Sequence, residues 1–227
     1  MCLYSGEIFN NTAKKYLECK IKVLEKHSID EILKVQAKNY KFIRDKSLYV
    51  PITHEELDEI FSGKGYVLGV FVTGKLVAFR ILSFHDAETI KLAKKAGLDD
   101  SRRVIFFEST LVDYNYIGNG LQKKMINLSL EKIIDRNLFE YGISTVSPKN
   151  IPSIKSLLKT GFYIKNNVAM YGGKARFICI INLASSNQDD IVHKATGHIY
   201  DFERQVEFFN LGYKIVDIEK DTYIFSK

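Results

Sequence analysis

Residues 112–125 read VDYNYIGNGLQKKM, with the glycines Gly118 and Gly120 between a strand-like run and a helix-like run. The run VIFFESTLV over residues 104–112 predicts a buried strand. From Gly120 to Arg136 the apolar residues recur with helical spacing, which predicts an amphipathic helix. Glycines at such a junction permit a tight turn, and they also let an anion approach the helix N–H groups. The glycine pair alone leaves both interpretations open.

The segments around this junction predict a chain of alternating strands and helices. Strands are predicted at 17–23, 66–72, 76–84, 104–112, 141–147, 162–171 and 175–183. Helices are predicted at 28–42, 53–63, 86–96, 120–136 and 150–160, the first two from capping boxes at Ser28–Glu31 and Thr53–Glu56. The polar stretch 185–190 predicts a linker, followed by a helix at 201–210 and two short strands. Ligands of alternating α/β sheets bind beyond the carboxyl ends of strands, which is where Gly118 and Gly120 lie.

The composition indicates a globular protein and excludes several classes. Of 227 residues, 46% are hydrophobic and 26% charged, and no apolar run has the length of a membrane span. The first fifteen residues lack the pattern of a signal peptide. Three scattered cysteines and five histidines (27, 54, 85, 193 and 198) show no metal-binding spacing, so we expect no metal and a reduced, cytoplasmic protein. The net charge of +6 is spread along the chain, which does not favour a nucleic-acid partner.

A second stretch, SPKNIPSIKSLLKTGF at 147–162, completes a recognisable pattern. Together the two stretches resemble the GNAT superfamily of acyl-CoA-dependent N-acetyltransferases. The family motif V-x-P-x-x-R/Q-G-x-G-x-G/A is matched in part by residues 112–122. An asparagine, a small residue three positions on and a Gly-Phe pair eleven positions on follow in the family's register, at Asn150, Ser153, Gly161 and Phe162. The order of elements agrees from residue 17 to residue 183, about three quarters of the chain.

The resemblance implies a mixed α/β fold. It implies a mostly antiparallel sheet that is splayed in the middle, helices on both faces, and here a C-terminal helix–strand–strand extension. We expect an N-terminal segment at 1–16, the acetyltransferase domain at 17–183 and the extension at 184–227. The extension is expected either to complete the sheet or to form the contact of a homodimer.

The resemblance also implies direct transfer of an acetyl group from acetyl-CoA to a primary amine of a small molecule or peptide. Acetyl-CoA is then the co-substrate. From the spread charge and the lack of a long apolar run, we expect neither a nucleic acid nor a membrane as a partner. The residues implied in coenzyme binding are Leu111, Val112, Ile117, Gly118, Asn119, Gly120, Leu121, Gln122, Asn150 and Ser153. Glu108, the only acid in the run 104–112, is the candidate general base. The alternatives are that Glu108 pairs with Arg80 or faces solvent.

Four positions depart from the family's pattern. Ile117 replaces the usual Arg or Gln, Tyr114 the proline, and Gln122 the final small residue. Leu157 stands where many members have a tyrosine that protonates the departing thiolate. The departure at Leu157 supports an alternative function, a non-catalytic acyl-CoA-binding module. The acceptor pocket is expected from residues 28–62, 86–100 and 166–174, and no acceptor is indicated.

Overall fold

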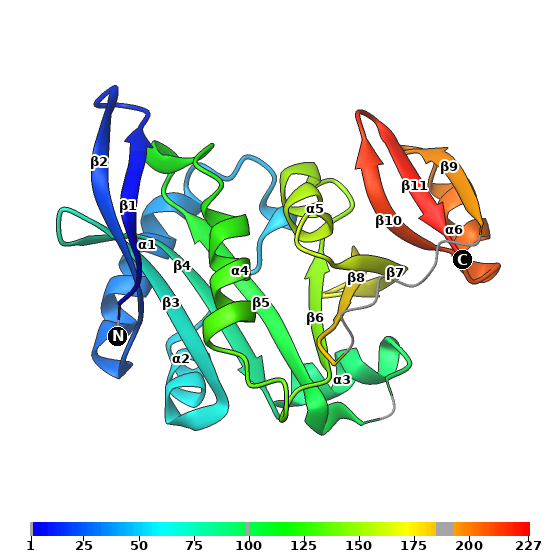
Figure 1. The fold of residues 1–227 in the computed structure, drawn as a ribbon, viewed down its shortest axis with the longest axis horizontal. Helices are drawn as coiled ribbons and strands as arrows, with labels where there is room; N and C mark the ends of the chain where they lie inside the picture. Colours follow the sequence, from blue (N-terminus) through cyan, green and yellow to red (C-terminus); the bar gives the residue numbers. More distant parts are fainter. Residues whose placement is uncertain (1, 99, 185–192) are drawn as a thin grey trace. The chain divides into compact units, whose positions relative to one another are not determined.

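The computed structural model describes residues 2–98, 100–184 and 193–227. The chain forms two compact units, Met1–Asp86 with Phe106–Ile134 and Ala87–Ile105 with Asp135–Lys227 (Figure 1). Both units combine antiparallel strand pairs with helices, which confirms the mixed α/β class and the mostly antiparallel sheet. The splay expected in the middle of the sheet stays a prediction. Among the described residues, no helix has the length and apolar character that a membrane span requires.

The first unit is built on strands in the order β1 (Cys2–Asn10), β2 (Lys15–Val23), β3 (Gly65–Val72), β4 (Lys75–Phe84) and β5 (Val104–Val112). The first three pairs in this order are antiparallel. Strand β1 was not predicted, and it pairs with β2. The expected domain boundary between residues 16 and 17 falls inside β2, which begins at Lys15. The turn between β3 and β4 has positive φ at Thr73 and Gly74, as a two-residue hairpin loop requires.

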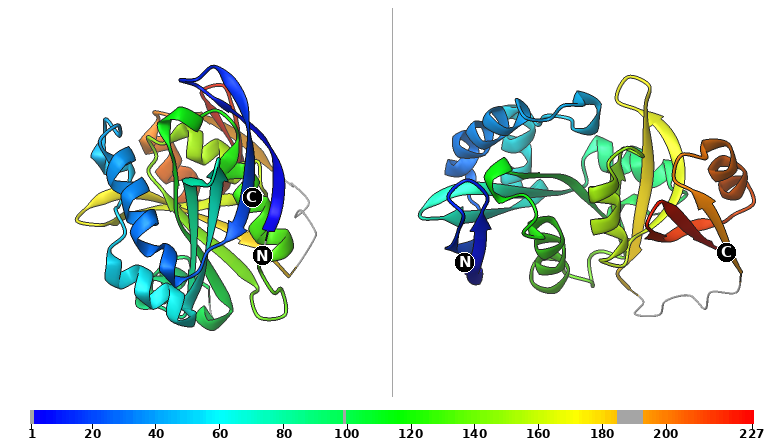
Figure 2. Two further views of the ribbon diagram at one scale, coloured as in Figure 1. Left: turned by 90° about the vertical axis from the view of Figure 1, so that its left-hand side faces the viewer. Right: turned by 90° about the horizontal axis from the view of Figure 1, so that it is seen from above.

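Helices cover both faces of the first unit's strands (Figure 2, right). Helices α1 (Ile29–Tyr40) and α2 (His54–Glu59) lie on one side and α4 (Leu121–Lys132) on the other. The apolar side chains of α1 and α2 share a buried cluster with β3, β4 and β5, in which Ile32, Leu57 and Phe79 are fully buried. Burial of such side chains is the main source of stability for helices this short.

The two predicted capping boxes had different outcomes. The box of Thr53 and Glu56 is present, with both reciprocal hydrogen bonds. The box of Ser28 and Glu31 was wrong, because Ser28 lies in a 3₁₀ turn that precedes α1 and has helical φ and ψ. Glu31 Oε1 instead accepts a 3.0 Å hydrogen bond from Leu76 N, which ties α1 to β4.

The second unit contains α3 (Ala87–Lys95) and strands in the order β6 (Tyr141–Val146), β8 (Lys174–Asn182), β7 (Tyr163–Met170), β10 (Lys214–Glu219), β11 (Thr222–Ser226) and β9 (Lys194–His198). All five neighbouring pairs in this order are antiparallel. Helix α5 (Ile151–Leu158) leads into β7, and α6 (Phe202–Asn210) leads into β10. Gly161 and Gly212 end the two helices with φ of 92° and 85°.

The C-terminal extension continues the sheet of the second unit. Ile215 of β10 pairs with Ile164 of β7, and both side chains are fully buried. Phe177 of β8 makes edge contacts with the rings of Phe209 and Tyr223. The helix–strand–strand extension is therefore confirmed, with β9 as an additional strand. The linker predicted at 185–190 lies outside the described residues, and the division at residue 184 stays a prediction.

Candidate functional site

The loop between β5 and α4 leaves its backbone uncovered around the two glycines. Gly118 and Gly120 have φ of 91° and 65°, in the left-handed region that favours glycine. A side chain added at either position would meet no atom within 4 Å. The turn thus needs glycine for its conformation, and the space beside it is open to a ligand.

The N-terminus of α4 follows this loop at once. Gly120 is the N-cap residue and has no side chain with which to cap the helix. Lys124 N donates to Gly120 O at 3.0 Å, so the helical ladder begins at Lys124. The N–H groups before that point have no partner within a helix, and together with the helix dipole they favour an anion. Lys123 and Lys124 add positive charge in the first turn.

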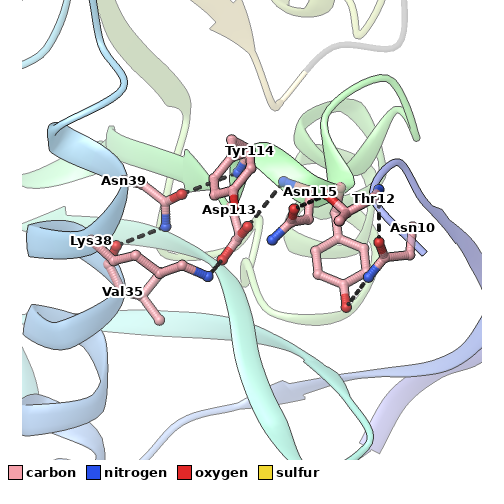
Figure 3. Close-up of polar contacts among 9 residues, drawn as sticks. Asn10, Thr12, Val35, Lys38, Asn39, Asp113, Tyr114 and Asn115 are labelled. Carbon is pink, nitrogen blue, oxygen red and sulfur yellow. Dashed lines mark hydrogen bonds and ion pairs between the residues drawn. The ribbon is translucent and has the colours of Figure 1, made fainter. Parts of the chain in front are cut away.

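Helix α1 anchors the segment that precedes the glycines (Figure 3). Lys38 Nζ lies 2.5 Å from Asp113 Oδ2, and the Asp113 side chain is 5% exposed. Asn39 Oδ1 accepts a 3.0 Å hydrogen bond from Tyr114 N, and Asn39 Nδ2 donates to Val35 O at 2.8 Å. The sequence did not point to Lys38, Asn39 or Asp113, because 75 positions separate each pair of partners.

The hairpin of β1 and β2 contacts the same loop. Thr12 Oγ1 lies 2.5 Å from Asn115 Oδ1, and Asn10 Nδ2 donates to the hydroxyl of Tyr116 at 3.0 Å (Figure 3). The amide of Asn119 is bonded to the backbone of β1 rather than left open. The predicted binding residue Asn119 therefore has an intramolecular role in the structure.

The other expected coenzyme residues of the first unit differ in exposure. Leu111 packs in the cluster below α1 and α2, and Leu121 is buried at the start of α4. Val112 and Gln122 are partly buried, whereas Ile117 is 59% exposed. The N–H of Asp113 donates to Val77 O at 2.8 Å and so is already engaged.

Asn150, Ser153 and Leu157 lie in the second unit, on α5. Asn150 is the N-cap residue, and its Oδ1 accepts a 3.3 Å hydrogen bond from Ser153 N. Pro152 stands in the first turn, where its missing N–H costs no helical hydrogen bond. Leu157 is 2% exposed, so the position of the family's tyrosine is occupied here by a core side chain.

The candidate base Glu108 lies on β5 and interacts electrostatically with the partly buried Tyr49. Burial raises the pKa of Tyr49, the negative charge of Glu108 raises it further, and a hydrogen bond from Ser109 lowers it. The Tyr49 hydroxyl donates to Gln36 Oε1 at 2.8 Å. Gln36 also accepts from Ile52 N and donates to Ile52 O. Tyr49 and Gln36 both lie within the expected acceptor region 28–62, and no local pattern pointed to their contact.

Arg80 contacts β5 at two other residues. Its guanidinium donates to Thr110 Oγ1 and lies 5.2 Å from the ring centroid of Phe107. The side chain is 2% exposed, and Nε has no hydrogen-bond partner among the described residues. Burial lowers the pKa of Arg80 to about 9, so the group remains charged at neutral pH. Thr110 and Phe107 thus contact Arg80, while Glu108 and Ser109 interact with Tyr49.

Within residues 2–98, 100–184 and 193–227, no three His, Cys, Asp or Glu side chains are grouped so that they could hold an ion. The three cysteines are free, and burial raises the pKa of Cys19 and of Cys179.

Solved structures with the same arrangement of elements decide the fold. A GNAT-family acetyltransferase from Streptococcus pneumoniae superposes with a TM-score of 0.55 at 14% identity, covering 72% of this chain and 98% of its own. The ribosomal-protein-S5-alanine acetyltransferase of Vibrio fischeri gives 0.56 at 11% identity, covering 82% of this chain and 100% of its own. The chain has the GNAT acetyltransferase fold.

A third GNAT-fold match comes from Salmonella typhimurium, the acetyltransferase yncA in a structure with its cofactor acetyl-CoA. It superposes at 0.53 with 14% identity, covering 76% of this chain and 98% of its own. The superpositions show the GNAT fold. At identities this low they do not show the activity, which has to be argued from the site. No protein-family model and no curated protein matches the sequence of the chain.

Proposed function

We propose that the protein is an N-acetyltransferase that moves an acetyl group from acetyl-CoA to a primary amine of a small molecule or peptide. The observation that carries this proposal is the uncovered glycine loop at the N-terminus of α4, directly after the strand that bears Glu108. Three solved structures of acetyltransferases with this fold support it.

The loop is the proposed site of the coenzyme's pyrophosphate. Backbone N–H groups from Gly118 to Gln122 would bind its oxygens, since the glycines leave them accessible. Leu111 and Val112 would hold the pantetheine through their backbone, and Asn150 and Ser153 complete the proposed set. The Asn150 side chain caps α5 and the Leu121 side chain is buried. We therefore assign these two residues the role of fixing the backbone of the proposed site rather than contacting the coenzyme with their side chains.

Glu108 is the proposed acceptor of the proton from the attacking ammonium. The neutral amine then attacks the thioester carbonyl, a C–N bond forms, the C–S bond breaks, and the CoA thiolate leaves. The nitrogen releases its second proton to water as the neutral amide forms. A primary amine has a pKa near about 10 and is mostly protonated at neutral pH, so the step needs a base. A positioned carboxylate typically contributes roughly 10²–10⁴-fold.

The thiolate needs no dedicated acid from the protein. Thiols have pKa values near about 8.5, so the anion is a fair leaving group and takes its proton from water. Leu157 cannot donate a proton, and its burial leaves no space for a hydroxyl without repacking. Tyr49 keeps its proton at neutral pH, but its hydroxyl is engaged with Gln36.

A second candidate is a binding module that holds acyl-CoA without turning it over. The buried Leu157 in the tyrosine position favours it. Incubating the purified protein with acetyl-CoA and a panel of primary amines, while following free thiol, separates the two. Amine-dependent release of thiol supports the transferase, and tight CoA binding without release supports the module. Failure to bind CoA at all would contradict both.

A further inference from the structure

The N-terminal hairpin, β1 and β2, lies along α4. Lys132 Nζ, at the C-terminal end of α4, donates to Leu3 O at 2.9 Å. Nearer its N-terminus, Lys124 Nζ lies 3.4 Å from the ring centroid of Tyr4. Leu3 and Ile8 are both buried, so β1 is packed rather than loosely attached. Strand β1 therefore follows the helix toward the glycine loop.

At that end, Asn119 bonds to the main chain of β1 as a neighbouring strand would. Phe9 N donates to Asn119 Oδ1 at 2.7 Å, and Asn119 Nδ2 donates to Phe9 O at 2.9 Å. The same Nδ2 donates to Tyr116 O at 2.9 Å. Both protons of the amide and its oxygen are thus used within the protein. The residue between the two glycines is held by a strand 110 positions earlier in the chain.

The turn that follows β1 holds the rest of the loop. Asn11 N donates to Asn115 O at 2.7 Å, and Asn11 Nδ2 donates to Ile117 O at 2.9 Å. Asn10 Oδ1 stabilises the turn itself by accepting from Thr12 N and from the next N–H. The carbonyl groups of residues 115–117 are therefore all bonded, two to this turn and one to Asn119.

Such bonding determines what the loop presents to a ligand. A segment with two glycines has high conformational entropy when free, and ordering it on binding would weaken affinity. Here the carbonyl groups of 115–117 are engaged before any ligand arrives. The uncovered backbone at Gly118 and Gly120 then lies at the start of α4.

We propose that the N-terminal hairpin positions this loop for the coenzyme, and that Asn119 is the positioning residue. The inference rests on the proposed function, since it assigns a role within the same site. It offers a physical reason why Ile117 is tolerated where the family motif has Arg or Gln. A fixed loop loses less entropy on binding, which offsets the loss of one charged contact to the pyrophosphate.

The test compares Asn119→Ala with Lys132→Ala, which removes a hairpin contact at the far end of α4. Calorimetry with CoA should show about tenfold weaker binding for Asn119→Ala, because the three hydrogen bonds that order the loop are lost, and near wild-type binding for Lys132→Ala. In the unliganded protein, hydrogen exchange at residues 117–122 should be faster in Asn119→Ala only. The KM for acetyl-CoA should rise, and the KM for the amine should not.

Two further variants keep the test decisive. Asn119→Asp retains the acceptor for Phe9 N, loses both donated bonds and places a negative charge beside the proposed pyrophosphate site, so its affinity for CoA should fall at least as far as that of Asn119→Ala. If Asn119→Ala does not fold, Thr12→Val, which removes one exposed bond to Asn115, should raise loop exchange and weaken CoA binding by a smaller factor.

The outcomes separate this inference from the proposed function. Equal CoA affinity and equal loop protection in wild type and Asn119→Ala would overturn the positioning role. A wild-type protein that binds no CoA would overturn the proposed function, and the exchange comparison in the unliganded protein would still decide whether the hairpin orders the loop.

Discussion

Tyr49 and Glu108 interact electrostatically: Tyr49 is partly buried, and burial first and the negative charge of Glu108 second raise its pKa. The strand that leads to the glycine loop thus carries its one carboxylate next to a neutral hydroxyl that hydrogen-bonds to α1 through Gln36. Lys38 and Asn39, in the same part of α1, hold the segment that precedes the glycines. Helix α1 therefore contacts both Tyr49, which interacts with the proposed base, and the segment that leads into the proposed coenzyme loop.

Glu108→Gln should lower turnover by roughly 10²-fold at pH 7, since it removes the proposed base and keeps the shape of the side chain. The loss should shrink to less than about tenfold near pH 10, where the amine is largely neutral without help. The measurement is a pH–rate profile of thiol release. Glu18→Gln, on an exposed position of β2, is the control and should follow the wild type. An equal loss at every pH would leave Glu108 as a substrate-binding or structural residue.

In Tyr49→Phe the free energy of unfolding should decrease less between neutral and alkaline pH than it does in the wild type. A group whose pKa is raised in the folded state stabilises below its unfolded pKa, about 10 for tyrosine, and this contribution is lost as the pH rises further. At pH 7 the variant should be less stable by about 1 kcal/mol, because the bond to Gln36 is lost. Denaturant unfolding at pH 7 and pH 11 should show the gap narrowing. A gap that widens with pH would contradict the assigned direction.

Arg80→Met should leave the free energy of unfolding unchanged or raise it by about 1 kcal/mol. The buried guanidinium donates to Thr110 while its Nε is unpaired, and replacing such a charge by an apolar side chain of similar volume is often neutral or stabilising. Urea unfolding of the variant and of Arg80→Met/Thr110→Val, which removes both partners, measures this. A loss of more than about 2 kcal/mol in both variants would show that the charge stabilises the fold.

The fold could be predicted from the sequence wherever local pattern and packing agree. The run 104–112 is a strand with those bounds, and Thr53–Glu56 caps α2 as expected. The C-terminal helix and its two short strands are present as the sequence predicts. In each case the hydrophobic period, the cap or the glycine that specifies the element lies within a few neighbouring residues.

Strands β1 and β9 escaped prediction for different reasons. The buried residues of β1, Leu3 and Ile8, have opposite parity because the register shifts near the start of the strand, so simple alternation is lost. Strand β9 reads KATGH and has no apolar pattern, and its pairing with β11 holds it in place. Both strands form by pairing with another strand, β1 with β2 and β9 with β11, and their own sequences carry no pattern that predicts this pairing.

The candidate site could be predicted where backbone conformation is decisive and not where distant side chains meet. Gly118 and Gly120 have the positive φ and the open surroundings that the motif suggests. The bond of Asn119 to Phe9 and that of Asp113 to Lys38 join residues 110 and 75 positions apart, and no local pattern predicts such pairs. The roles of Glu108 and of the loop in catalysis stay proposals.

Titration of CoA into the wild type, Gly120→Asn and Gly74→Asn tests the central claim most directly. Both glycines have positive φ, and a side chain at either meets no atom within 4 Å, so asparagine, which tolerates this conformation, should cost similar stability at both. The account predicts CoA binding at least about tenfold weaker for Gly120→Asn, because the side chain occupies the approach to the backbone, and wild-type binding for Gly74→Asn. Wild-type affinity in Gly120→Asn would contradict the placement of the coenzyme at this loop.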